Sequence, residues 1–209
     1  MTSIFISSLN CSSCGEANSF ERYDRIDVSK TPQCRAALID WELFKYTCKH
    51  CGHQVIIDYP TFYADEENKV IIQYLPSNCS DLASVKSIKE LAATLDITKY
   101  KYRVVTNLED FVEKVQIFSE GMDDKAIEFM KYLKSPNEEE DIMFSYDHMV
   151  FTKVGPVAYQ FIFIDQKEVV ASLNFSSESY LDALVEVADA GEGEFVIDKD
   201  WAEKFARQR

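Results

Sequence analysis

Two pairs of cysteines constrain this chain of 209 residues more than any other feature. "CSSCG" spans residues 11–15 and "CKHCG" spans residues 48–52, so each pair has the spacing Cys-x2-Cys and is followed by glycine. Two intervening residues let both sulfurs of a pair reach one ion, and glycine relieves crowding where the backbone turns toward a thiolate. Runs typical of strands flank both pairs. We therefore expect the front of the chain to fold around one site where the pairs meet.

The two pairs together supply four thiolates, which is a complete ligand set for a structural zinc ion held about 2.3 Å from each sulfur. We predict zinc as the cofactor, with Cys11, Cys14, Cys48 and Cys51 as its ligands. Four cysteines leave no coordination position for water, so we expect the ion to stabilise the fold and not to catalyse. The residues do not decide between zinc and iron.

Other interpretations of the cysteines stay open. Each pair is compatible with a redox dithiol, although that motif is typical of a helix start after a strand, and here strand patterns follow both pairs. His50 and His53 are alternative ligands, although four cysteines already complete the set. Cys34 and Cys79 belong to neither pair, and we interpret both as small buried apolar residues.

Strand patterns dominate the first 79 residues. We expect strands at residues 3–9, 17–28, 42–48, 53–65 and 68–76. A short helix is expected within residues 31–41, because Thr31 can cap it and Pro32 suits the first helical position. Strands on both sides of each cysteine pair are typical of a zinc ribbon.

Helices and strands alternate in the middle of the chain. The pattern predicts a helix at residues 80–97 and a strand at 99–105. Thr106 and Glu109 form a predicted capping box for the next helix, whose apolar face comprises Leu108, Phe111, Val112, Val115 and Phe118. Gly121 fits the end of that helix. Asp123 or Asp124 should begin another, with Ala126, Phe129, Met130 and Leu133 buried.

Residues 135–141, "SPNEEED", are the best candidate for a linker. Three strand-like runs follow and predict an antiparallel meander, with turns near Tyr146–His148, Gly155–Pro156 and Gln166–Lys167. A helix around Tyr180–Ala188, a strand near Phe195 and a final capped helix complete the chain. We predict an α+β fold with a zinc-binding domain at 1–135, built from zinc-ribbon-like β hairpins and helices, and an antiparallel α+β lobe at 142–209.

The arrangement resembles a known family. Its cysteine knuckles stand about thirty residues apart, the second lies between "LIDWELFKYT" and "GHQVIIDYPTFYADEENKVIIQYLP", and "YRVVTNLEDFVEKVQIFSEGMDDKAIEFMKYLK" follows. This resembles the CpXC domain proteins of bacteria and archaea over roughly residues 1–135, with all four cysteines of the pairs at the family's cysteine positions. The family's proline is Ser12 in one knuckle and Lys49 in the other. The resemblance implies a fold and a metal site, and it implies no reaction.

Charge and hydropathy narrow the possible partners. The net charge is −14, from 22 Lys/Arg and 36 Asp/Glu; residues 1–79 carry −3 and the remainder −11. A surface this acidic repels phosphate backbones, so we predict no nucleic-acid binding and a protein partner. No apolar run approaches the ~20 residues of a membrane span, and the start lacks a basic segment, so we expect a cytoplasmic protein.

The sequence contains no recognised catalytic motif. It has no GxGxxG, GxxxxGK[ST], HExxH or GxSxG pattern. His148 beside Asp147 is one candidate general base, and Asp123 with Asp124 is a candidate magnesium site, but turn formation and helix capping explain both. We therefore favour an interaction or adaptor protein. An enzyme using Asp123, Asp124 or His148 remains the alternative.

Overall fold

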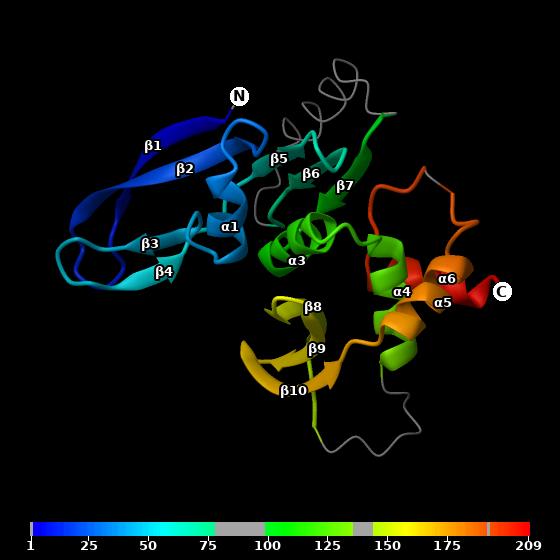
Figure 1. The fold of residues 1–209 in the computed structure, drawn as a ribbon. Helices are drawn as coiled ribbons and strands as arrows, with labels where there is room; N and C mark the ends of the chain where they lie inside the picture. The colour runs from blue at the N-terminus through cyan, green and yellow to red at the C-terminus, as the bar shows by residue number, and fades with distance from the viewer. Residues whose placement is uncertain (1, 78–98, 136–143, 192) are drawn as a thin grey trace. The chain divides into compact units, whose positions relative to one another are not determined.

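A computed structural model of the chain divides into two compact units, Met1–Val115 and Gln116–Arg209. It describes residues 2–77, 99–135, 144–191 and 193–209. Five helices and mixed sheets in this part confirm the predicted α+β class (Figure 1). The expected helix at 80–97 and most of the expected linker lie outside the described residues, and the domains 1–135 and 142–209 stay a prediction.

The N-terminal unit contains a five-stranded sheet with the strand order β1-β2-β5-β6-β7. Its strands are β1 (Ser3–Asn10), β2 (Ala17–Asp27), β5 (Thr61–Asp65), β6 (Val70–Tyr74) and β7 (Lys101–Val105). β2 pairs with β5 and β6 with β7 in parallel, whereas the other two pairings are antiparallel. The alternating and apolar runs of the sequence therefore become strands largely where they were expected.

A smaller antiparallel hairpin, β3 (Lys45–Thr47) with β4 (Gln54–Ile56), carries the second cysteine pair. The single strand expected at 53–65 is wrong, because the structure has β4 and β5 there, in different sheets. Pro60 stands between them and has no N–H to donate to a ladder. The two strands can therefore part and serve the hairpin and the main sheet separately.

Aromatic side chains fill the interior of this unit. The ring of Phe44 stacks on Tyr59 at 4.6 Å between centroids, and Tyr74 stacks on Phe111 at 5.3 Å. Phe44 also meets Phe111 edge to face at 6.2 Å. Such pairs add to the free energy gained by burial, so the hairpin segment and helix α3 (Leu108–Ser119) are tied to the sheet by one aromatic cluster.

Two predicted helix caps are wrong. Helix α1 (Gln33–Ile39) begins after Pro32 without a side-chain cap, since Thr31 donates its hydroxyl to the carbonyl of Asp27 instead. The cap of α3 is Asn107, whose Oδ1 accepts from the backbone N–H of Asp110 at 2.7 Å. Asn107 is a stronger cap than threonine, so the helix begins one residue later than the predicted box.

The next helix, α4 (Asp124–Lys134), begins as the sequence indicates. Gly121 has a φ of +70°, and Asp123 accepts hydrogen bonds from the N–H groups of Lys125 and Ala126. Its buried face includes the predicted Ala126, Phe129 and Met130. Leu133 is 59% exposed, so its expected burial is wrong: the last turn of the helix extends beyond the core.

The C-terminal unit contains the predicted antiparallel meander. Strands β8 (His148–Gly155), β9 (Ala158–Asp165) and β10 (Glu168–Asn174) lie in the order β10-β9-β8. Gln166 and Lys167 form the two-residue turn between β9 and β10, with φ values of +48° and +70°. Positive φ at both positions is the geometry that matches the twist of a tight hairpin.

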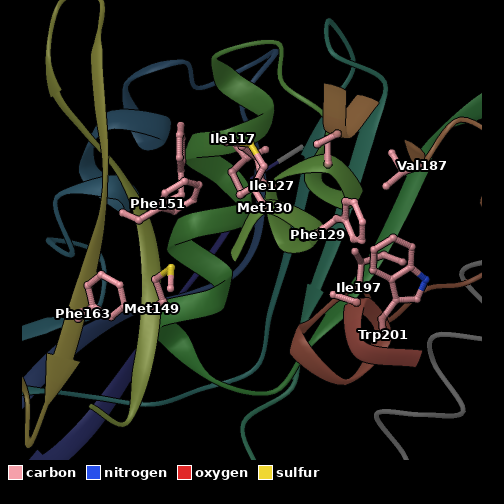
Figure 2. Packing of buried hydrophobic residues seen from close by; sticks show 14 residues of the cluster. Ile117, Ile127, Phe129, Met130, Met149, Phe151, Phe163, Val187, Ile197 and Trp201 are labelled. Atoms are coloured by element: carbon pink, nitrogen blue, oxygen red, sulfur yellow. The ribbon is translucent and has the colours of Figure 1, made fainter. Parts of the chain in front are cut away.

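One apolar cluster organises this unit (Figure 2). α4 packs against helices α5 (Ser177–Glu186) and α6 (Lys199–Arg207). Phe151 and Phe161 from the sheet belong to the same cluster as Phe129 of α4 and Trp201 of α6. The cluster therefore joins sheet and helices into one core.

The strand expected near Phe195 is absent, although the final capped helix is present. Phe195 is 45% and Val196 51% exposed, whereas Ile197 is buried in the cluster. Asp198 then caps α6 by accepting from the N–H of Trp201 at 2.9 Å. The segment therefore enters the core at Ile197 and leads directly into the helix, without pairing as a strand. Among the described helices, none combines the length and apolar character of a membrane span.

Candidate metal centre

The four cysteines of the two pairs lie at the tips of two hairpins. The first pair connects β1 to β2, whose last paired residues are Asn10 and Ala17. The second pair connects β3 to β4 beyond the pairing of Thr47 with Gln54. Figure 1 shows both tips at the same end of the N-terminal unit. Each hairpin places its own pair at a tip, and the packing of the unit brings the two tips together.

Both tips have the same backbone hydrogen bonds. The N–H of Cys11 donates to the carbonyl of Glu16 at 2.9 Å, and the N–H of Cys48 donates to that of His53 at 2.8 Å. The N–H of the following glycine returns to the carbonyl of the first cysteine, at 2.9 Å in each tip. Gly15 and Gly52 have φ values of +77° and +73°, which a side chain would strain. Glycine is thus needed for its positive φ, whereas the expected relief of crowding is wrong, because a Cβ at either position would meet no atom within 4 Å.

The four sulfurs form one compact group. All four Sγ atoms lie within 4.8 Å of one another, and two cross-hairpin pairs, Cys11–Cys51 and Cys14–Cys48, are separated by 3.7 Å. Sulfurs about 2.3 Å from a central ion in a tetrahedron stand about 3.8 Å apart, whereas a disulfide brings them to about 2.05 Å. The spacing fits four ligands of one metal ion, and the cysteines are free.

The electrostatics of the group also fit a cation. Hydrogen bonds from the backbone of Cys51 and His50 lower the pKa of the Cys48 thiol to about 5, against the effect of its desolvation. A hydrogen bond from Glu16 lowers the pKa of Cys14, but desolvation and the three neighbouring thiols together raise it to about 12. Thiolates this close repel one another, and a divalent cation offsets that repulsion.

The group has a buried side and an exposed side. Cys11 and Cys48 are 3% and 2% exposed, whereas Cys14 and Cys51 are exposed. On the buried side, the Tyr46 hydroxyl makes no hydrogen bond of normal geometry. Burial, and then the neighbouring Cys48, raises the pKa of this hydroxyl to about 12. This hydroxyl lies beside the Cys48 thiol, and a metal-bound thiolate there would accept a hydrogen bond from it.

The alternative ligands lie outside the sulfur group. Among the described residues, the group that could hold an ion comprises the four cysteines alone, without His50 or His53. The Nε2 atom of His53 instead lies 3.2 Å from the hydroxyl of Ser12. Cys34 is buried at 7% exposure, as expected for a small apolar residue, and Cys79 lies outside the described residues.

The sequence did not reveal one further residue at this site. Asn18 is 8% exposed, and its side chain reaches both hairpins. It lies four positions after Cys14, outside either cysteine motif. Its partners in the second hairpin are about thirty residues away, so no local pattern could have identified it. The only signal in the sequence was that a polar residue stands on a strand face where apolar residues are expected.

The three candidate catalytic residues either cap a helix or have buried side-chain atoms. Asp123 caps α4, and Asp124 is fully buried. The Nε2 atom of His148 is buried without a hydrogen bond at the start of β8. A groove of about 690 Å³ lies along α6, and none of these three residues lines it.

Comparisons with known proteins give one family match. The family model described as "CpXC protein" matches residues 9–131, which is more than half of the chain and includes both cysteine pairs. No curated protein and no solved structure matches.

Proposed function

The chain belongs to the CpXC protein family, and we propose that its N-terminal unit is a structural zinc module within an interaction protein. Zn²⁺ would be held by Cys11, Cys14, Cys48 and Cys51. The ion would supply a tetrahedral cross-link between the two hairpin tips. One observation carries this proposal: two hairpin tips with the same backbone hydrogen bonds bring four free thiols to the spacing of a single coordination sphere.

The donor set favours a structural role over a catalytic one. Four sulfurs complete the usual coordination of zinc and leave no position for water or substrate. Apparent binding energies of structural zinc are about 10–16 kcal/mol, comparable with the stability of a whole domain at about 5–15 kcal/mol. The metal would therefore decide whether the two hairpins are fixed against each other.

Metal analysis of the purified protein tests the zinc assignment. We expect one zinc per chain, and cobalt substitution should give the absorption bands of a tetrahedral tetrathiolate site. Cys34→Ser is a matched control, because it removes a buried cysteine outside the group and should retain the metal. Iron at the site, or no metal at all, would contradict the zinc assignment.

For the rest of the molecule, we propose a protein partner with a basic surface. The C-terminal unit has nine Lys/Arg and twenty Asp/Glu, a net charge of −11. Its groove along α6 combines carboxylates with apolar side chains and is lined by Glu194, Phe195, Val196, Asp198, Asp200, Trp201, Glu203, Lys204 and Arg207. Phe195 and Val196 are about half exposed beside these acidic groups. A basic segment with an apolar anchor would complement both features.

A pull-down from the native cell tests this partner and locates its surface. With the wild-type protein, we expect a partner that is retained with chelator and released by salt. Asp200→Lys, in the groove, should weaken the capture, whereas Asp182→Lys, exposed on α5, should not. If the chelator abolishes the capture and Asp200→Lys does not weaken it, the binding surface lies on the zinc module instead.

A further inference from the structure

A single amide side chain connects the two halves of the metal centre. Asn18 stands at the beginning of β2, in the first hairpin, and is 8% exposed. A buried amide has two donor hydrogens and an acceptor oxygen, and leaving them without partners costs free energy. Asn18 therefore needs hydrogen-bond partners within the fold that replace water.

The partners of Asn18 come from both hairpins. Its Nδ2 donates to the carbonyl of Glu16, in its own hairpin, at 2.9 Å. The same nitrogen donates to the Sγ of Cys48, in the second hairpin, at 3.6 Å. Its Oδ1 accepts from the backbone N–H of Lys49 at 3.4 Å. The reverse orientation of the amide would set its oxygen against a carbonyl and a sulfur, so these contacts define the orientation.

The bond to Lys49 depends on which residue stands there. Lys49 follows the first cysteine of its pair, and a proline at this position would have no N–H to give to Asn18. Ser12 holds the same place in the first pair, and its hydroxyl lies 3.2 Å from the Nε2 atom of His53 in the other hairpin. Both positions thus make contacts between the hairpins that proline would not make.

The two contacts differ in their surroundings. The Ser12–His53 contact is exposed, so water competes for it. The contact between Asn18 and Cys48 is buried, where a hydrogen bond to sulfur is less weakened by solvent. Asn18 is therefore the stronger connection, and it acts on the second hairpin through Cys48 and its neighbour.

We propose that Asn18 is the positioning residue of the metal centre: it holds the Cys48 tip against the first hairpin and so prearranges the four sulfurs for the ion. The inference rests on the proposed zinc site. Asn18 does not ligate the metal but supports a ligand, and groups in this role typically change metal affinity by about 10–100-fold.

Competition with a chromophoric chelator measures the effect on Zn²⁺ affinity. Asn18→Ala should lower the affinity by about 10–100-fold and shift the sulfur-to-metal absorption of the Co²⁺ form, since Cys48 loses its N–H donor. Val55→Ala is the matched control, because Val55 lies four positions after Cys51 as Asn18 lies four after Cys14, and it is 38% exposed. It should leave both readouts unchanged.

Two further substitutions test the hydrogen bonds of Asn18 one at a time. Asn18→Asp keeps an oxygen for Lys49 but loses the donor to Cys48, so it should shift the Co²⁺ spectrum. Lys49→Pro removes the N–H and also fixes φ at this position. If the lost bond to Asn18 matters, the substitution should weaken Zn²⁺ binding in wild type but have little further effect when combined with Asn18→Ala.

Wild-type Zn²⁺ affinity and an unchanged Co²⁺ spectrum in Asn18→Ala would overturn the proposal. If Asn18→Ala does not fold, an unshifted spectrum in Asn18→Asp overturns it equally. Failure of the wild-type protein to bind Zn²⁺ or Co²⁺ would instead overturn the proposed zinc module itself.

Discussion

Different interactions hold the strands and helices of the two units in place. In the C-terminal unit, fourteen buried residues form one cluster that reaches from the sheet to α6. In the N-terminal unit, the aromatic cluster around Phe44 lies at one part of the sheet, whereas the hairpin tips carry exposed residues and four free cysteines. Apolar packing therefore stabilises the C-terminal unit throughout, whereas it is scarce at the hairpin tips of the N-terminal unit.

The charges of the units differ as well. Thirteen Lys/Arg nearly balance sixteen Asp/Glu in Met1–Val115, whereas the C-terminal unit has nine against twenty. Self-repulsion of like charges disfavours a compact state, yet the more acidic unit is the one with the continuous core. Local burial, and not charge balance, is therefore what distinguishes the hairpin tips, where the proposed metal would lie. The following predictions test that difference.

The largest effect should come from Cys48→Ser. Loss of one proposed ligand should abolish stable metal binding and expose the amides of both hairpins to exchange, because binding of the proposed ion would contribute folding free energy there. Metal analysis with hydrogen–deuterium exchange measures both, and the amides around Phe151 should stay protected. A native exchange pattern in metal-free Cys48→Ser would show that the hairpins do not depend on the ion.

Phe151→Ala should have the converse effect. Phe151 is fully buried in the C-terminal cluster, and its truncation should cost about 3–5 kcal/mol of unfolding free energy. Denaturant unfolding measures the loss, and zinc content should stay at the wild-type value. Val157→Ala, at a site 88% exposed, is the control and should change stability by less than about 0.5 kcal/mol. Zinc loss in Phe151→Ala would contradict the separate origins of stability.

Asp123→Ala distinguishes helix capping from metal binding in the C-terminal unit. The side chain accepts from two N–H groups at the start of α4, so its removal should cost about 1 kcal/mol. Added Mg²⁺ should not change the melting temperature of wild type or variant. Asp182→Ala, on an exposed position of α5, should be nearly neutral. Stabilisation of the wild type by Mg²⁺ that Asp123→Ala abolishes would instead support the alternative magnesium site.

The smallest effect concerns acid sensitivity. Burial alone would raise the pKa of the Glu120 carboxyl, but hydrogen bonds from Lys153 and Tyr159 lower it overall from its usual 4.5. A lowered folded-state pKa means that this stabilisation is present above the unfolded-state pKa and is lost as pH falls through the folded-state value.

Glu120→Gln should therefore lose less stability than wild type between about pH 5 and pH 2, with a difference of about 1 kcal/mol or less. Thermal melts across this range measure it. Equal acid sensitivity of wild type and Glu120→Gln would show that the ion pair contributes nothing to stability. The absorption of the Co²⁺ form at neutral pH should be the same in both proteins, because Glu120 belongs to the other unit.

Much of the fold follows from local pattern. Alternation and strong β formers placed β1, β2 and β6, and the positive φ required after each cysteine pair was visible as glycine. One error arose where neighbouring residues compete for one role, as with Thr106 and Asn107 at the start of α3. Sequence patterns also could not show that β4, before Pro60, belongs to a different sheet from β5.

The sequence by itself determined the number of thiols, their pairing in two motifs and the turn at each tip, because these depend on residues within a few positions of one another. The two matched motifs also predicted that the tips share one site. Only the tertiary structure decided how close the four sulfurs lie, that Cys11 and Cys48 face inward, and that Asn18 lies between the hairpins. Such contacts join residues thirty or more positions apart. Their geometry depends on how whole strands pair and pack, and no local propensity encodes that.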